Sequence, residues 1–78
     1  TEVFIDGVRI IDCVDVAVLM KELEPGKCLV SMRSKGVDVS VIATEFGGGG
    51  HVRAAGCTIE EPLAEAKTKL LEAISRHI

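Results

Sequence analysis

Four consecutive glycines, Gly47 to Gly50, stand in the middle of this 78-residue chain and lead directly into His51. Glycine loses more backbone freedom on folding than any other residue, so a run of four is costly for a small domain. Gly47 is explained as the end of a helix, and two glycines suffice for a turn. We therefore expect Gly48, Gly49 and Gly50 to contact a ligand, with a tightly packed or flexible turn as the alternative.

Residues 14–34 predict a β-hairpin, because apolar side chains alternate there with a period of two. The turn of residues 24–27 has a proline second and a glycine third, which tight turns favour. Residues 3–11 predict another strand, broken at Asp6-Gly7. One face of the first strand is expected to carry Val14, Val16, Val18 and Met20, and one face of the second Cys28, Val30 and Met32.

Two helices are expected after the hairpin. Asp38 caps the first, which ends at Gly47, and Pro62 opens the second, where proline is tolerated in the first turn. Between them, Cys57-Thr58-Ile59 predicts a strand. The apolar stripes are Val39, Ile42, Ala43 and Phe46 on the first helix and Leu63, Ala66, Leu70 and Ile74 on the second.

These elements predict an α/β fold, a small mixed β-sheet with packed helices, as one domain over residues 1–78. On the exposed face of the last helix we expect two ion pairs at i,i+4 spacing. They are Glu65–Lys69 and Glu72–Arg76.

The composition limits what such a domain binds. There is no Trp or Tyr, which argues against stacking bases on aromatic platforms. Cys13, Cys28 and Cys57 form no Cys-x-x-Cys pair, so we interpret them as small buried residues of a protein from a reducing, cytoplasmic compartment. No apolar run is long enough to span a bilayer, and no membrane partner is expected.

The basic side chains are concentrated around the glycines. The net charge of the chain is −3, yet residues 27–53 carry four basic and two acidic side chains, a local balance of +2. A positive region on an acidic body suits a small phosphorylated ligand better than a long polyanion.

Four side chains of this segment have the chemistry of a phosphate clamp. Arg33 and Arg53 offer guanidinium groups, Ser34 a hydroxyl and His51 an imidazole. The alternative is a solvated charge at Arg33 and a structural histidine at His51. The sequence shows no Asp and His cluster for metal-assisted hydrolysis, and no nucleophile with a nearby base. It therefore predicts binding without a catalytic residue of its own.

Three segments carry a resemblance to a known family. They are Val30-Ser31-Met32-Arg33-Ser34-Lys35-Gly36, then Val37-Asp38-Val39-Ser40 with Ile42-Ala43, and Phe46-Gly47-Gly48-Gly49-Gly50-His51 followed by Arg53-Ala54-Ala55-Gly56. Together they resemble the DHH-associated domain, the C-terminal domain of the DHH phosphoesterase superfamily. Within it, the similarity is greatest to bacterial oligoribonucleases that also act as phosphatases of 3′-phosphoadenosine 5′-phosphate, a group related to exopolyphosphatases.

The resemblance implies the substrate-binding part of a longer two-domain protein. In that family an N-terminal domain carries the Asp-His-His motif and a pair of manganese ions, so manganese is expected there and no cofactor in this chain. The implied partners are that domain and a phosphorylated nucleotide or short single-stranded RNA, and a homodimer is left open. By position, the residues implied to hold the phosphate and line the nucleotide site are Arg33, Ser34, Gly48, Gly49, Gly50, His51 and Arg53.

Two other classes of function are considered. A non-catalytic nucleic-acid-binding appendage, as in the related C-terminal domain of alanyl-tRNA synthetases, would need a broad basic face. The net charge of −3 argues against it. A structural or oligomerisation domain would use its glycines only as turns, and substitution of His51 would then change stability but no ligand affinity.

Overall fold

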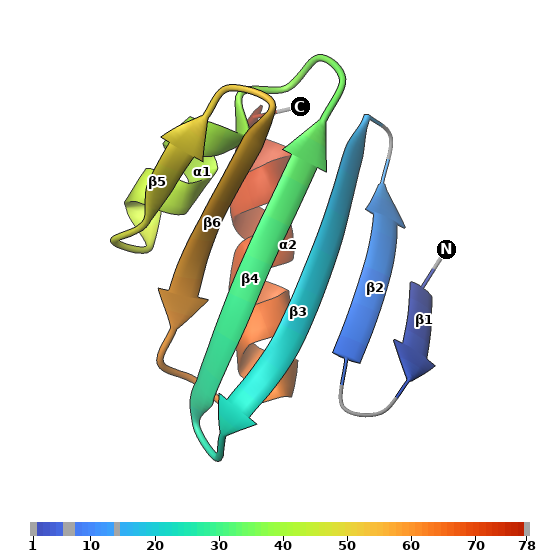
Figure 1. Cartoon of the computed structure of the whole chain (residues 1–78), viewed down its shortest axis with the longest axis vertical. Helices are drawn as coiled ribbons and strands as arrows, with labels where there is room; N and C mark the ends of the chain where they lie inside the picture. The colour runs from blue at the N-terminus through green and yellow to red at the C-terminus, as the bar shows by residue number, and fades with distance from the viewer. Residues whose placement is uncertain (1, 6–7, 14, 78) are drawn as a thin grey trace.

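The computed structural model describes residues 2–5, 8–13 and 15–77, and the backbone alone of Ile5 and Cys13. These residues form a six-stranded sheet in the order β1-β2-β3-β4-β6-β5, with both helices against one face (Figure 1). Neither described helix is long and apolar enough to cross a membrane. The elements are β1 (Glu2–Ile5), β2 (Val8–Cys13), β3 (Val16–Glu24), β4 (Lys27–Ser34), α1 (Val39–Glu45), β5 (Gly49–His51), β6 (Ala54–Ile59) and α2 (Leu63–His77).

The α/β class is confirmed, but the sheet is antiparallel rather than mixed. Every strand pairing among the described residues is antiparallel. The difference arises at β5, a Gly-Gly-His strand that has little intrinsic preference for extended structure and was not expected. Because β5 turns the chain back before β6 begins, β6 enters the sheet antiparallel to β4.

The predicted hairpin is confirmed as β3 and β4, with a φ of +84° at Gly26 in the turn. The strand predicted over residues 3–11 is confirmed as β1 and β2, and its break at residues 6–7 lies outside the described residues. The predicted strand at residues 57–59 is the end of the longer β6. Val14 is also outside the described residues. The other members of the two predicted faces are buried: Val16, Val18, Met20, Cys28, Val30 and Met32.

Two cysteines are buried in the core, as expected. Burial raises the pKa of Cys57 to about 11, so its thiol is protonated at neutral pH. Burial also raises the pKa of Cys28, whose Sγ donates to the carbonyl oxygen of Glu61 at 3.4 Å. The side chain of Cys13 lies outside the described part of the chain.

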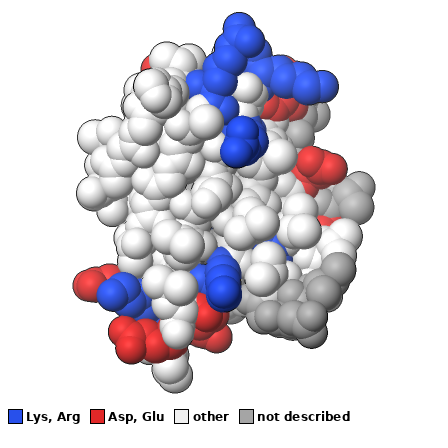
Figure 2. Space-filling view, in the orientation of Figure 1, with Lys and Arg blue, Asp and Glu red and all other residues white. Residues whose placement is uncertain are grey.

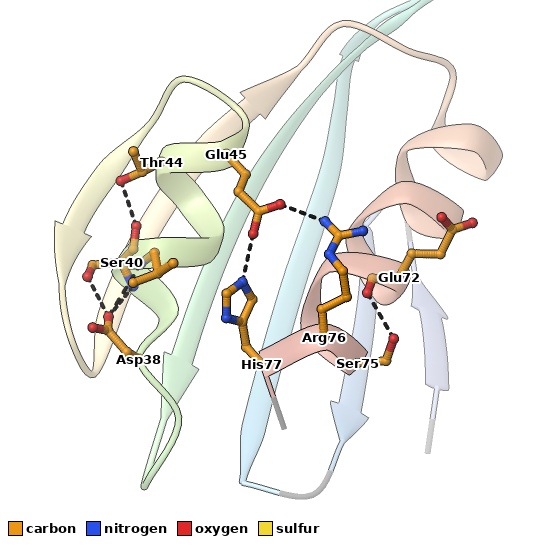
Figure 3. Close-up of polar contacts among 9 residues, drawn as sticks. Asp38, Ser40, Thr44, Glu45, Glu72, Ser75, Arg76 and His77 are labelled. Carbon is orange, nitrogen blue, oxygen red and sulfur yellow. Dashed lines mark hydrogen bonds and ion pairs between the residues drawn. The ribbon is translucent and has the colours of Figure 1, made fainter.

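α1 begins and ends as the sequence predicts. The Asp38 carboxylate accepts hydrogen bonds from the backbone N–H of Ser40 at 3.0 Å and from the Ser40 hydroxyl (Figure 3), which lowers the pKa of Asp38. Gly47, with a φ of +81°, ends the helix. The N–H of Gly48 then donates to the carbonyl oxygen of Ala43 at 2.9 Å. Helix α1 is thereby held directly before the glycine run.

The ion pairs expected on α2 are wrong. Lys69 pairs with Glu61 at 3.5 Å, and Arg76 pairs with Glu45 of α1 at 2.6 Å. His77 Nε2 lies 2.7 Å from the other oxygen of Glu45 (Figure 3). One carboxylate between two partners on the neighbouring helix is a tertiary arrangement that i,i+4 spacing does not reveal. The buried residues of α2 are Ala66, Leu70, Ala73 and Ile74, with Leu63 partly buried.

Candidate functional site

Arg33 of β4 and His51 of β5 project from the face of the sheet that the helices leave open. Both pair directly with Ala54 of β6, one from each side. Residues that pair directly across neighbouring strands point to the same face of the sheet. Because Met32 is buried against the helices and Arg33 is exposed, this face is the open one. Adjacent strands lie about 4.8 Å apart, so the Cα atoms of Arg33 and His51 are about 10 Å apart with one methyl group between them. Two long polar side chains therefore flank a gap that suits a phosphate group.

Two backbone hydrogen bonds join the end of β4 and the start of α1 to the turn between β5 and β6. The N–H of Ser34 donates to the carbonyl oxygen of Arg53, and the N–H of Val39 donates to that of Val52, both at 2.9 Å. The Arg-Ser and Gly-His segments, which are far apart in the sequence, are thereby parts of one local structure. This is the arrangement that a shared site requires.

Basic side chains gather at the end of the sheet where β4 ends and β6 begins (Figure 2). Arg33, His51 and Arg53 are exposed, and their side chains form no hydrogen bond or ion pair with any described residue. Cations on the helix side are instead neutralised by carboxylates, as in the pairs of Arg9 and Lys67 with Glu2. The candidate site therefore keeps cations that are available to an anion.

Ser34 has a structural role that limits what it offers a ligand. Its Oγ accepts hydrogen bonds from the N–H groups of Gly36 at 3.2 Å and Val37 at 2.7 Å. These contacts fix the loop after β4 and occupy the lone pairs of the hydroxyl. The hydroxyl proton is left as a donor, which is the polarity that a phosphate oxygen needs.

Gly48 and Gly50 are required by packing. A Cβ atom on Gly48 would lie 2.2 Å from the carbonyl oxygen of Gly56. A Cβ atom on Gly50 would lie 2.6 Å from the Cα of Ala55, and the φ of Gly50 is +146°. Close packing against β6 thus accounts for a glycine at both positions, in and directly before a strand rather than in the turn that the alternative expected. The expected contact of these glycines with a ligand stays a prediction.

Gly49 differs from the glycines on either side of it. A Cβ atom there would have no neighbour within 4 Å. Gly49 pairs with Gly56, which pairs with Ser31, so these three residues form a row on the open face next to the row of Arg33 and His51. No side chain in the row is larger than that of serine. The fold does not need a glycine at position 49, and the open face is flat at this point.

A hollow of about 370 Å³ opens beside this flat row. Ser31, Ala54 and Gly56 were not predicted as residues of the candidate site. The small residues at alternate positions of β6 indicate a face without large side chains and could have identified it. The hollow is lined by Leu29, Val30, Ser31, Phe46, Gly47, Gly48, Gly56, Cys57 and Thr58.

The described residues do not fit a metal ion. Among them, no three His, Cys, Asp or Glu side chains lie close enough to hold one. The manganese ions that the resemblance implies therefore have no candidate site in this part of the chain. The site can hold an anion, and no chemical step is assigned to it.

Comparison with known proteins places these features in a family. The family model described as the DHHA1 domain matches residues 4–78. The chain is 38% identical over 77 residues to the bifunctional oligoribonuclease and PAP phosphatase NrnA of Thermus thermophilus. That match covers 96% of this chain and 24% of the relative, so the chain spans about a quarter of the relative's length.

Proposed function

The chain belongs to the DHHA1 domain family, and we propose that it is the substrate-binding domain of a phosphoesterase that hydrolyses short oligoribonucleotides or 3′-phosphoadenosine 5′-phosphate. The observation that carries the proposal is the pairing of Arg33 and His51 with the same residue, Ala54, on the open face. The name of the Thermus relative, an oligoribonuclease and PAP phosphatase, supports the choice of substrate.

In this proposal Arg33 and His51 bind one phosphate from two sides. The guanidinium of Arg33 donates two hydrogen bonds to phosphate oxygens, and the imidazole of His51 donates a third. Arg53, at the tip of the β5–β6 turn, closes the wall of the site. The hydroxyl proton of Ser34 is an additional donor, because its lone pairs are already used by the loop.

When this phosphate joins two nucleosides, one of them lies over the glycines. Gly49 and the adjacent hollow offer a flat surface without large side chains, and Gly48 lines that hollow. Gly50 contributes by holding β5 against β6, because its side-chain position faces Ala55. A surface of this kind accepts any base, which suits an enzyme that acts on short fragments of varied sequence.

Catalysis belongs to a second domain in this proposal. Manganese ions, if held by that domain, would supply the metal-assisted hydrolysis, and no residue of this chain is assigned to hold them. This chain contributes by position, since a phosphate fixed at Arg33 sets the distance between the scissile bond and the catalytic groups. Loss of Arg33 in the whole enzyme should therefore lower the rate and leave metal binding unchanged.

The test is an NMR titration of the chain with a 5′-phosphorylated diadenylate. We expect weak binding, with a Kd of roughly 0.1–1 mM, and shifts at Arg33, Ser34, the glycine run and His51. Arg33→Ala should abolish these shifts. Lys21→Ala removes a cation from the same face at the other end of the sheet and should leave them intact. Equal binding by wild type and Arg33→Ala would refute the proposal.

A further inference from the structure

A second hollow, of about 250 Å³, opens on the side of Arg33 that faces away from His51. Its floor includes Ala17, which pairs directly with Arg33 on the open face. One wall carries carboxylates and the other carries cations, so it suits a ligand with both hydrogen-bond donors and negative charge. The lining residues are Asp12, Asp15, Val16, Ala17, Arg33, Ser34 and Lys35.

Asp15 is held close to the loop that follows Arg33. Its carbonyl oxygen accepts a hydrogen bond from the N–H of Lys35 at 3.0 Å. Its Oδ2 lies 3.9 Å from the position that a Cβ atom on Gly36 would take. The turn between β2 and β3 and the loop after β4 therefore meet at the rim of the hollow.

The fold itself does not require a carboxylate at Asp15. Its φ of +65°, in the turn residue directly before Val16, is a conformation that Asn or Gly would adopt equally well. The side chain is exposed and makes no hydrogen bond or ion pair with any described residue. An acceptor-only group is therefore available beside the phosphate-binding arginine.

We propose that this hollow binds a ribose joined to the phosphate that Arg33 holds, on the side away from the glycines, with the Asp15 carboxylate accepting hydrogen bonds from the ribose hydroxyls. This inference rests on the proposed function. A sugar is bonded directly to its phosphate, so it must lie in a space adjacent to Arg33. The methyl of Ala17 packs against the apolar face of the ring, and the carboxylate selects hydroxyl groups over a further phosphate. Asp15 is in this way a specificity-determining residue for ribonucleotides.

The test compares adenosine 5′-monophosphate with 2′,3′-dideoxyadenosine 5′-monophosphate, each titrated into the chain and followed by NMR. Wild type should bind the ribonucleotide more tightly by a factor of roughly 3 to 10, as expected for one or two hydrogen bonds at an open site. Asp15→Gly keeps the turn and removes the carboxylate, so the two affinities should become equal. Asp15→Asn, which retains an acceptor oxygen, should give an intermediate ratio.

The readout is the ratio of the affinities for the ribonucleotide and the dideoxynucleotide. Loss of a negative charge near the site strengthens phosphate binding for both nucleotides, and this effect cancels in the ratio. Glu24→Gln, at the far end of β3, controls for net charge and should leave the ratio unchanged. Equal affinities in wild type, or a preference that survives in Asp15→Gly, would overturn the inference while phosphate binding stands. If neither nucleotide nor inorganic phosphate changes any chemical shift, the proposed function is refuted, and this inference with it.

Discussion

The backbone N–H of Ser34 donates to the carbonyl oxygen of Arg53 at 2.9 Å, and this contact fixes the Arg-Ser segment beside the Gly-His segment. It supports the placement of Arg33, at the end of one strand, relative to His51 on a three-residue strand. The paired register with Ala54 adds a second constraint, because both side chains must then leave the same face. The candidate site is thus built by backbone hydrogen bonds, and among the described residues the side chains of Arg33, His51 and Arg53 have no partner.

Gly50→Ala should destabilise the chain, and Gly49→Ala should not. The first places a Cβ atom 2.6 Å from Ala55 at a φ of +146°, which should lower the free energy of unfolding by about 2–4 kcal/mol. The second meets open space, and the change should stay within about 0.5 kcal/mol. Urea denaturation followed by circular dichroism measures both. Equal losses in the two variants would contradict the packing described for β5.

Gly49→Ala should nevertheless weaken ligand binding. The methyl group would rise from the flat row of Ser31 and Gly56, on which the proposed nucleoside lies. We expect the Kd for a 5′-phosphorylated diadenylate to increase roughly threefold or more. Ser31→Ala, which makes the same row smaller, is the matched control and should bind at least as well. If Gly49→Ala binds the diadenylate with unchanged affinity, the nucleoside does not lie on this surface.

Acid should destabilise the chain partly through Glu45. Hydrogen bonds from His77 and Arg76 lower the pKa of Glu45 from its ordinary value of 4.5, so the folded state binds this proton less readily than the unfolded state. The stabilisation is therefore fully present above pH 4.5 and is lost as the pH falls through the lower folded pKa. Hydrogen bonds from Lys67 to Glu2 and from Ser40 to Asp38 lower those pKa values in the same sense.

Glu45→Gln isolates this contribution. Unfolding free energies measured by urea from pH 6 downward should decline less steeply in Glu45→Gln than in wild type. Glu72→Gln removes an exposed carboxylate of α2 that has no ion pair among the described residues, and it should follow the wild-type profile. A Glu45→Gln profile parallel to wild type below pH 4.5 would show that the contact with Arg76 and His77 is not formed in solution.

The cap of α1 gives a prediction about local structure. Asp38→Ala removes the acceptor for the N–H of Ser40 and should lower the melting temperature. Asp38→Asn retains an acceptor oxygen at the same position and should lower the melting temperature much less. Hydrogen exchange of the amides of α1 should accelerate in Asp38→Ala before that of β3 or β4. Equal melting temperatures for the two variants would mean that the cap contributes nothing to stability.

Secondary structure was predictable from the sequence where local patterns determine it. Alternation of Val16, Val18 and Met20 predicted the hairpin, and Asp38 and Gly47 predicted the limits of α1. Strand β5 was missed because its glycines carry no pattern, and only its pairing with β6 makes it a strand. Such pairing is a long-range contact, and neither the composition nor the periodicity of apolar residues predicts it.

The sequence indicates the candidate side chains of the site but not their arrangement. Arg33, Ser34 and His51 were identified by their chemistry, yet the residue that aligns Arg33 with His51 is Ala54, which carries no chemical signal. The different roles of Gly49 and Gly50 depend on which face of β5 each one takes. A run of identical residues gives no means of telling them apart from sequence.

The central claim is that Arg33 and His51 bind the same phosphate, and a double-mutant cycle tests it most directly. The Kd of a 5′-phosphorylated diadenylate would be measured for wild type, Arg33→Ala, His51→Ala and the double variant. If both side chains hold one phosphate, the double variant should lose clearly less than the sum of the two single losses in binding free energy. Additive losses, or a His51→Ala variant that binds like wild type, would show that the two residues do not share a ligand.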